Sequence, residues 1–104
     1  MILQIKNIYG AVIYQADVAD LRTLLAQAIR LNVSLAQADL SNQDLSGLNL
    51  NGVMLQGAKL DNADLSNTLM GADFTGASMV NVKIKNATIT GAKLAKADTR
   101  HMKT

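Results

Sequence analysis

The sequence predicts an all-β solenoid, a coil of short straight sides and regular corners, behind a small N-terminal cap. Three observations predict it: from Val33 onward a large apolar residue recurs every five residues, glycine and asparagine gather in one slot of that period, and aromatic residues are scarce. A period of five fits neither the 3.6 residues of a helix nor the two of a strand. Glycine and asparagine tolerate positive φ, so a turn every fifth residue is cheap. We expect coils stacked about 4.8 Å apart to bury together what no single coil buries alone.

Residues 1–32 do not repeat and are predicted to form a β-hairpin and an amphipathic helix. Two β-prone runs flank a turn at Asn7–Gly10. Asp17 is expected to cap the helix, with Asp20 favourable in its first turn, and the helix should end near Asn32. We expect this segment to cover the first coil, because an open solenoid end exposes strand edges and core side chains. The apolar face of the helix comprises Val18, Leu21, Leu24, Leu25, Ala28 and Ile29.

Residues 33–104 contain fourteen quintets, and their central residues are expected to form a ladder inside the coil. Thirteen of these fourteen residues are large and apolar, and the last is Thr99. Six of the seven glycines occupy the fifth position of a quintet, which marks the corner. The predicted core ladder is Leu35, Leu40, Leu45, Leu50, Leu55, Leu60, Leu65, Leu69, Phe74, Met79, Ile84, Ile89 and Leu94.

One interval in the ladder is a residue short, because Leu65 and Leu69 are four residues apart. We interpret Thr68 as the second residue of its quintet, which makes the missing residue the small inward one. One coil earlier Leu48 stands where alanine or valine is usual, so we expect Leu48 to fill the vacated space. The alternative is harmless drift in a tolerant repeat.

The quintets Ala38-Asp39-Leu40, Ala63-Asp64-Leu65 and Ala72-Asp73-Phe74 follow the pattern A-[DN]-L-x-x. Over about two thirds of its length the chain therefore resembles the pentapeptide-repeat family. The resemblance implies a right-handed, four-sided β-helix with four quintets per coil, which gives roughly three and a half coils here. The hairpin and helix ahead of the repeats also resemble an arrangement found in some family members, so we expect one compact domain overall.

With four quintets per coil, every fourth quintet stacks, and one side carries no charge. Interface cores are depleted in charge, so this side is the candidate partner face. Its residues are Asn49, Asn51, Thr68, Met70, Thr88 and Thr90. An ordinary neutral surface is the alternative interpretation.

Charge also changes along the axis of the coil. Residues 33–76 contain five Asp and one Lys, a formal −4, whereas residues 77–104 contain five Lys, one Arg and one Asp, a formal +5. A basic end could meet nucleic acid or an acidic protein, but it lacks the aromatic residues on which single strands stack, which disfavours direct nucleic-acid binding. The candidate basic end comprises Lys83, Lys85, Lys93, Lys96, Arg100 and Lys103.

The sequence predicts neither catalysis nor a cofactor. It has no cysteine, and its one histidine, His101, cannot form a metal site by itself. It contains neither a phosphate-binding loop nor a serine in a nucleophile elbow. No apolar run is long enough to span a bilayer and no secretory signal is present, so we expect a cytoplasmic protein.

The leading functional hypothesis is a non-catalytic module that presents a rigid surface to a protein partner. The main alternative comes from the family resemblance, since some relatives imitate duplex DNA and act on DNA gyrase. By that analogy the chain would inhibit or protect a nucleic-acid enzyme, such as gyrase or a nuclease complex, as a small phage-type inhibitor does. A structural spacer is a third hypothesis, and a homodimer through the C-terminal coil remains open.

Overall fold

The chain begins with an antiparallel hairpin of two strands, β1 (Ile2–Lys6) and β2 (Val12–Asp17). The computed structural model describes residues 1–104. The turn between the strands is closed by Asn7, whose side-chain oxygen accepts hydrogen bonds from the backbone N–H groups of Tyr9 (2.9 Å) and Ala11 (3.0 Å). This asparagine side chain supplies the acceptor that such a turn needs.

The helix α1 (Leu21–Arg30) begins later than expected, because Asp20 and not Asp17 caps it. Asp20 accepts a hydrogen bond from the backbone N–H of Thr23 at 2.7 Å. Asp17 is instead the last residue of β2 and pairs with the N-terminal amine at 2.5 Å. The predicted cap at Asp17 is therefore wrong, and Val18 lies outside the helix. At ten residues, α1 is too short to cross a membrane, and it is the one helix of the structure.

The helix ends where the sequence suggests. Asn32 adopts a positive φ of 58°, and the backbone N–H of Val33 donates to the carbonyl of Ala28 at 3.0 Å. This arrangement is a Schellman motif, in which asparagine takes the left-handed position usually held by glycine. It directs the chain out of α1 and into the first coil.

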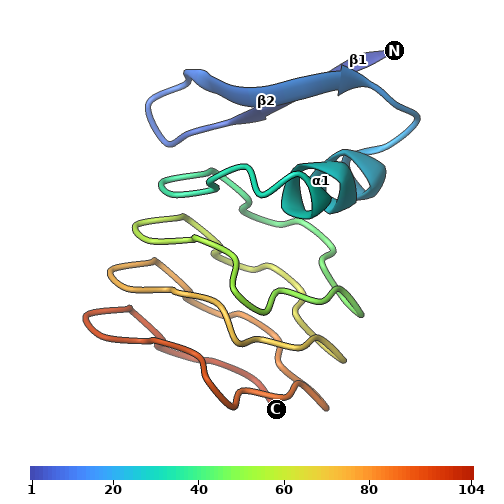
Figure 1. Ribbon diagram of the computed structural model, residues 1–104. Coiled ribbons are helices and arrows are strands. Elements are labelled where there is room, and N and C mark those ends of the chain that lie inside the picture. Colours follow the sequence, from blue (N-terminus) through green and yellow to red (C-terminus); the bar gives the residue numbers. More distant parts are fainter.

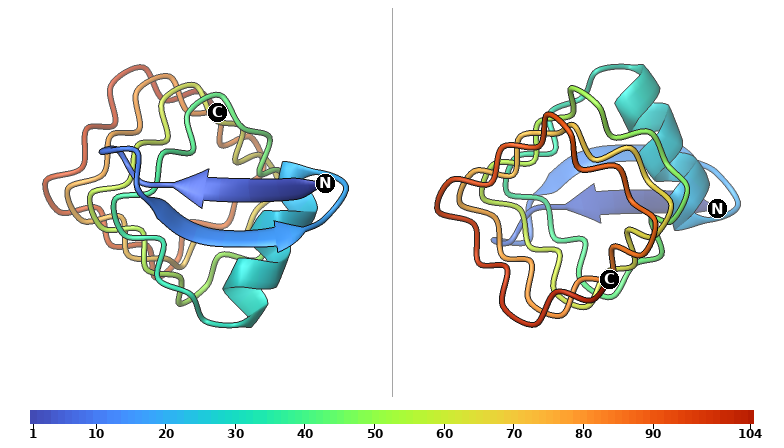
Figure 2. Two further views of the ribbon diagram at one scale, coloured as in Figure 1. Left: turned by 90° about the horizontal axis from the view of Figure 1, so that it is seen from above. Right: turned by 90° about the horizontal axis from the view of Figure 1, so that it is seen from below.

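The rest of the chain winds into stacked coils joined by parallel bridges (Figure 1), and the coils are square in outline when viewed along their axis (Figure 2). Asp39 bridges to Lys59, and Lys59 bridges to Ser78. Bridged residues are twenty positions apart when Gly71 does not lie between them in the sequence, as with 39 and 59. They are nineteen positions apart when Gly71 does lie between them, as with 59 and 78. Four quintets thus make one coil, and the missing residue lies at the corner containing Gly71.

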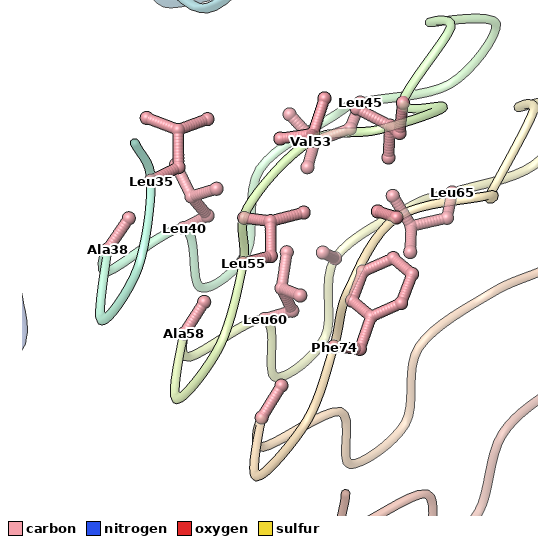
Figure 3. Close-up of a cluster of buried hydrophobic side chains, with 14 of the residues drawn as sticks. Leu35, Ala38, Leu40, Leu45, Val53, Leu55, Ala58, Leu60, Leu65 and Phe74 are labelled. Carbon is pink, nitrogen blue, oxygen red and sulfur yellow. The ribbon is translucent and has the colours of Figure 1, made fainter. Parts of the chain in front are cut away.

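Two inward positions of the quintet pack the lumen. Position one is buried in every quintet from Val53 to Val82, where it holds a small residue, and position three is buried in every quintet from Leu35 to Met79, where it holds a large one. Figure 3 shows Leu35, Leu55 and Phe74 stacked in successive coils, with Ala38 above Ala58 beside them. Each of these side chains is at most 1% exposed. The buried residues of position three are Leu35, Leu40, Leu45, Leu50, Leu55, Leu60, Leu65, Met70, Phe74 and Met79.

The structure corrects the ladder at the short interval. Thr68 is 1% exposed and occupies the small inward position, Met70 is fully buried at position three, and Leu69 points outward with 41% exposure. Leu69 bridges to Asn49 and to Thr88, both second residues of their quintets. The predictions that Leu69 belongs to the core and that Thr68 points outward are therefore wrong. Thr68 fills the inward slot itself, so no space is vacated for Leu48.

At the C-terminal end the ladder becomes exposed. Ile84 is half-buried, Ile89 is 53% exposed and Leu94 is 37% exposed. The prediction that Ile89 and Leu94 lie in the core is wrong for residues 1–104, because no coil among these residues lies beneath them.

The hairpin and α1 lie across the other end of the coil (Figures 1 and 2). The backbone N–H of Ile8 donates to the carbonyl of Gln37, and that of Asp39 donates to the carbonyl of Lys6, both at 2.8 Å. The Arg22 guanidinium donates to the carbonyls of Asp44 and Ser46. These contacts pair the upper edge of the first coil on two sides. The hairpin crosses the middle of the square outline, and α1 lies along one side of it (Figure 2). The buried residues that the cap adds to the core are Ile5 from β1 and Leu24, Leu25 and Ala28 from α1.

Candidate interaction surface

The four sides of the coil present different residues to solvent. We number the sides by the quintets they contain, so that the first side begins at residue 33, the second at 38, the third at 43 and the fourth at 48. The bridged second residues give each side its outward row. The rows are Met54, Asp73 and Lys93 on the first side; Asp39, Lys59, Ser78 and Asp98 on the second; Asp44, Asp64, Lys83 and Lys103 on the third; and Asn49, Leu69 and Thr88 on the fourth.

The fourth side carries no charged residue in any of its quintets, residues 48–52, 68–71 and 87–91. Four of the six residues predicted for the partner face are exposed on it: Asn49, Asn51, Thr88 and Thr90. The other two, Thr68 and Met70, are buried, so the candidate partner face cannot include them.

Sequence reasoning missed Leu69, which lies at the middle of the outward row. A signal for it existed, because Thr68-Leu69-Met70 also fits the pattern of small, outward and large residues. In that alignment Leu65 and Met70 are five residues apart, and the short interval moves to Met70–Phe74. Both alignments place an apolar residue inside, so the sequence pattern alone does not choose between them.

The corner after Met70 consists of Gly71 alone. The backbone N–H of Ala72 donates to the carbonyl of Met70 at 2.7 Å, which closes a three-residue turn. The backbone N–H of Gly71 donates to the side-chain oxygen of Asn51, one coil above, at 2.8 Å. Other corners use a backbone carbonyl of the next coil as this acceptor, as when Gly57 donates to Thr75. Asn51 thus satisfies the donor that the shortened corner would leave unpaired.

A groove follows this corner, between the fourth and first sides. It has a volume of about 220 Å³ and is lined in part by Gly52, Gly71 and Gly91. A smaller hollow of about 60 Å³ continues it toward the end of α1 and shares Gly52, Val53 and Met54 with it. The two hollows therefore lie next to one another beside the uncharged side.

Aspartates at position two hold the corners of the charged sides. The Ser46 hydroxyl and backbone N–H both donate to Asp44, and these bonds hold the pKa of that carboxyl below its usual value. Thr75 does the same for Asp73, and the pKa values of Asp39 and Asp64 are lowered in the same way. On the fourth side, Asn49 accepts from the backbone N–H of Asn51 at 3.0 Å, so an amide makes this turn without a charge.

All six residues of the candidate basic end are exposed. Arg100 pairs with Asp98 at 2.8 Å, while the five lysines lie further than 4.0 Å from any carboxylate. Lys83 and Lys103 bridge one another on the third side, directly below Asp64. The row on this side changes sign along the axis, from Asp44 and Asp64 to the two lysines.

His101 is exposed at a corner with φ of 60°, and no group of three or more acidic, histidine or cysteine side chains is placed to hold a metal ion.

Two comparisons with known proteins find similarity. The family model described as pentapeptide repeats, with 8 copies, matches residues 33–70 and 68–98. Among solved structures, the chain is similar to a pentapeptide repeat protein, Rfr23, from the cyanobacterium Cyanothece 51142. The identity is 26% and the TM-score 0.53, over 70% of this chain and 57% of that one. This chain thus matches little more than half of the solved protein, and no curated protein matches it.

Proposed function

Because the chain belongs to the pentapeptide-repeat family, we propose that it is a non-catalytic module that binds a protein partner through the fourth side of its coil. The proposal takes the scaffold to be a right-handed, four-sided tube of about three and a half coils, as the family resemblance implies. Such a scaffold holds its side chains in fixed rows, so little conformational entropy is lost when a partner binds.

The observation that carries the proposal is the exposure of Leu69 on the uncharged side. Leu69 is 41% exposed, and its neighbours in the outward row are Asn49 and Thr88. The centres of protein interfaces are poor in charge and rich in apolar contacts. A partner that covered Leu69 would bury apolar surface without removing any charge of this side from water.

The experiment that tests the proposal compares two lysine substitutions at equivalent positions. Met54 has the same exposure as Leu69, 41%, and occupies position two on the neighbouring first side. The tagged chain, Leu69→Lys and Met54→Lys are each used to capture proteins from a lysate of the native host, and captured proteins are identified by mass spectrometry. Binding of each captured protein is then measured with purified components.

We expect the unmodified chain and Met54→Lys to bind the same partner, and Leu69→Lys to lose it with an unchanged circular dichroism spectrum. Thr88→Lys should also lose it, because it places a charge on the same row. Equal binding by Leu69→Lys would reject the fourth side as the interface. A partner that duplex DNA displaces would favour the alternative of DNA mimicry, to which the sign change on the third side gives little support. If neither the unmodified chain nor any variant captures a partner, a structural spacer is favoured.

A homodimer is a second proposal, and the exposure of Ile89 and Leu94 favours it. Pairing the two basic ends would bring like charges together, so such a dimer needs compensation from Asp98 across the contact. Light scattering across a dilution series distinguishes a dimer from a monomer. A mass of one chain at every concentration would reject the homodimer and leave the partner proposal intact.

A further inference from the structure

Asn51 and Gly52 form the one Asn-Gly dipeptide of the sequence. Asparagine followed by glycine is the dipeptide in which spontaneous deamidation is easiest, because glycine has no Cβ to hinder its backbone nitrogen. In this reaction the Gly52 nitrogen, after losing its proton, attacks Cγ of Asn51. The bond from Cγ to the side-chain nitrogen breaks, and ammonia leaves. Water then opens the cyclic imide to an aspartate or an isoaspartate, so the reaction needs no other reagent.

In the folded chain both reacting groups are held by Gly71. The nucleophile, the backbone N–H of Gly52, donates to the carbonyl of Gly71 at 3.0 Å. The electrophile, the side-chain amide of Asn51, accepts from the backbone N–H of Gly71 at 2.8 Å. The backbone N–H of Asn51 is in turn held by Asn49 at 3.0 Å. Cyclisation requires the Asn51 side chain to turn onto its own backbone, so it must first break the contact with Gly71.

We propose that Asn51–Gly52 is a deamidation site that the fold holds closed through the one-residue corner at Gly71, and that opening of this corner starts the reaction. The closure depends on glycine at position 71, since a Cβ there would overlap the side-chain oxygen of Asn51. Gly71 does not have a positive φ, so alanine there brings no left-handed strain, and the severe overlap is with the Asn51 side chain.

The modification would add a negative charge to the fourth side, which has none. An aspartate at position 51 could still accept from Gly71, whereas an isoaspartate would add a backbone atom to the corner and disturb the stacking. If the fourth side binds a partner, deamidation weakens that binding. This consequence rests on the proposed function, but the deamidation itself does not.

The test follows deamidation at Asn51 by peptide mapping and mass spectrometry in mildly alkaline buffer. The full chain is incubated folded and in concentrated urea, and Asn62, followed by Ala63, serves as an internal reference. Gly71→Ala is compared with Gly76→Ala, which makes the same change at a corner where no atom lies within 4 Å of the new Cβ. Because Gly76 has a φ of 70°, this control also strains the backbone and reports on general destabilisation.

We expect deamidation at Asn51 to be at least about tenfold slower in the folded chain than in urea. In urea, Asn51 should deamidate faster than Asn62. Gly71→Ala should accelerate it in the folded state and leave the rate in urea unchanged, while Gly76→Ala should not accelerate it. If Asn51 of the wild-type chain deamidates at the same rate in the folded state and in urea, that result alone overturns the proposal. A folded Gly71→Ala chain that reacts no faster than wild type would also overturn it.

A separate measurement addresses the partner. Asn51→Asp should weaken the binding that Leu69→Lys abolishes. If Leu69→Lys abolishes binding but Asn51→Asp leaves it unchanged, the effect of deamidation on binding is rejected and the proposed function stands. If neither variant changes binding, the proposed function fails, and the deamidation kinetics still stand or fall by themselves.

Discussion

Residues 68–70 show how a buried hydroxyl is accommodated in this fold. Thr68 occupies a slot that alanine or valine usually fills, and its hydroxyl donates to the carbonyl of Leu65 at 2.7 Å. A buried polar group of this kind costs little when it is hydrogen-bonded. The threonine therefore takes the small inward position, and the next apolar residue to face the lumen is Met70 and not Leu69.

Alanine substitutions at Leu69 and Met70 should show which of the two residues lies in the lumen. Met70→Ala should lower the free energy of unfolding by about 2–5 kcal/mol, because it leaves a cavity in the core. Leu69→Ala should change it by no more than about 0.5 kcal/mol, because Leu69 is partly in solvent. Urea unfolding followed by circular dichroism measures both. The opposite order of effects would contradict the burial described here.

At the scale of the element, the corner is the unit that repeats. Its second residue accepts hydrogen bonds from the fourth, so an aspartate followed two residues later by serine or threonine stabilises the turn locally. Asp44 with Ser46 and Asp73 with Thr75 illustrate this. On the fourth side Asn49 performs the same task without a charge, so one corner of that side keeps this bond although the side is neutral.

These corners should make the protein sensitive to acid. The pKa values of Asp39, Asp44, Asp64 and Asp73 are lowered from 3.8, chiefly by hydrogen bonds from the neighbouring hydroxyls. A carboxyl whose pKa is lowered by folding stabilises the folded state above its unfolded value, and this contribution is lost as the pH falls through the folded value. We expect the free energy of unfolding to be steady from neutral pH to about pH 5 and to fall below about pH 4.

Ser46→Ala provides the control for this behaviour. Removing the hydroxyl that donates to Asp44 should raise the pKa of that carboxyl, measured by carbon NMR, and leave the pKa of Asp73 unchanged. An unchanged pKa of Asp44 would show that the hydroxyl is not the cause.

For the whole molecule, stability depends on closing the N-terminal end of the coil. Stacked coils pair every edge but the outermost, and an unpaired edge attracts other chains. The hairpin pairs with the second side of the first coil, and Arg22 donates hydrogen bonds to two backbone carbonyls of the third side. Ile5 of β1 and the buried face of α1 join the apolar core of the coil, so the cap both pairs the edge and covers apolar side chains.

A charge on the inner face of the cap should therefore cause association. Leu25 is buried in α1 and its neighbour Ala26 is exposed. We expect Leu25→Asp to release α1 from the coil and so expose leucines of the first coil. These leucines should then pack against other chains, and light scattering should detect larger species. Ala26→Asp makes the same substitution one residue on and should keep the wild-type mass. A Leu25→Asp chain with unchanged mass and unfolding midpoint would refute this role of the cap.

Much of the fold follows from local chemistry and was predictable. The period of five, the small and large inward positions and the Gly or Asn corners each reflect the needs of a single quintet, which repeat along the chain. The hairpin turn and the end of α1 near Asn32 likewise depend on neighbouring residues. The start of α1 did not follow, because Asp17 and Asp20 are both good caps and pairing of β2 with β1 withdraws Asp17.

By itself, the sequence determined that the chain coils in quintets and that one side has no charge, because both are properties of residue type and spacing. Only the tertiary structure decided where the short quintet loses its residue. That choice depends on bonds between coils: Asn49 and Thr88 bridge Leu69, and Asn51 satisfies the N–H of Gly71. Contacts between residues some twenty positions apart therefore moved Leu69 to the surface and Met70 into the lumen, since two adjacent apolar side chains are equivalent until the neighbouring coil distinguishes them.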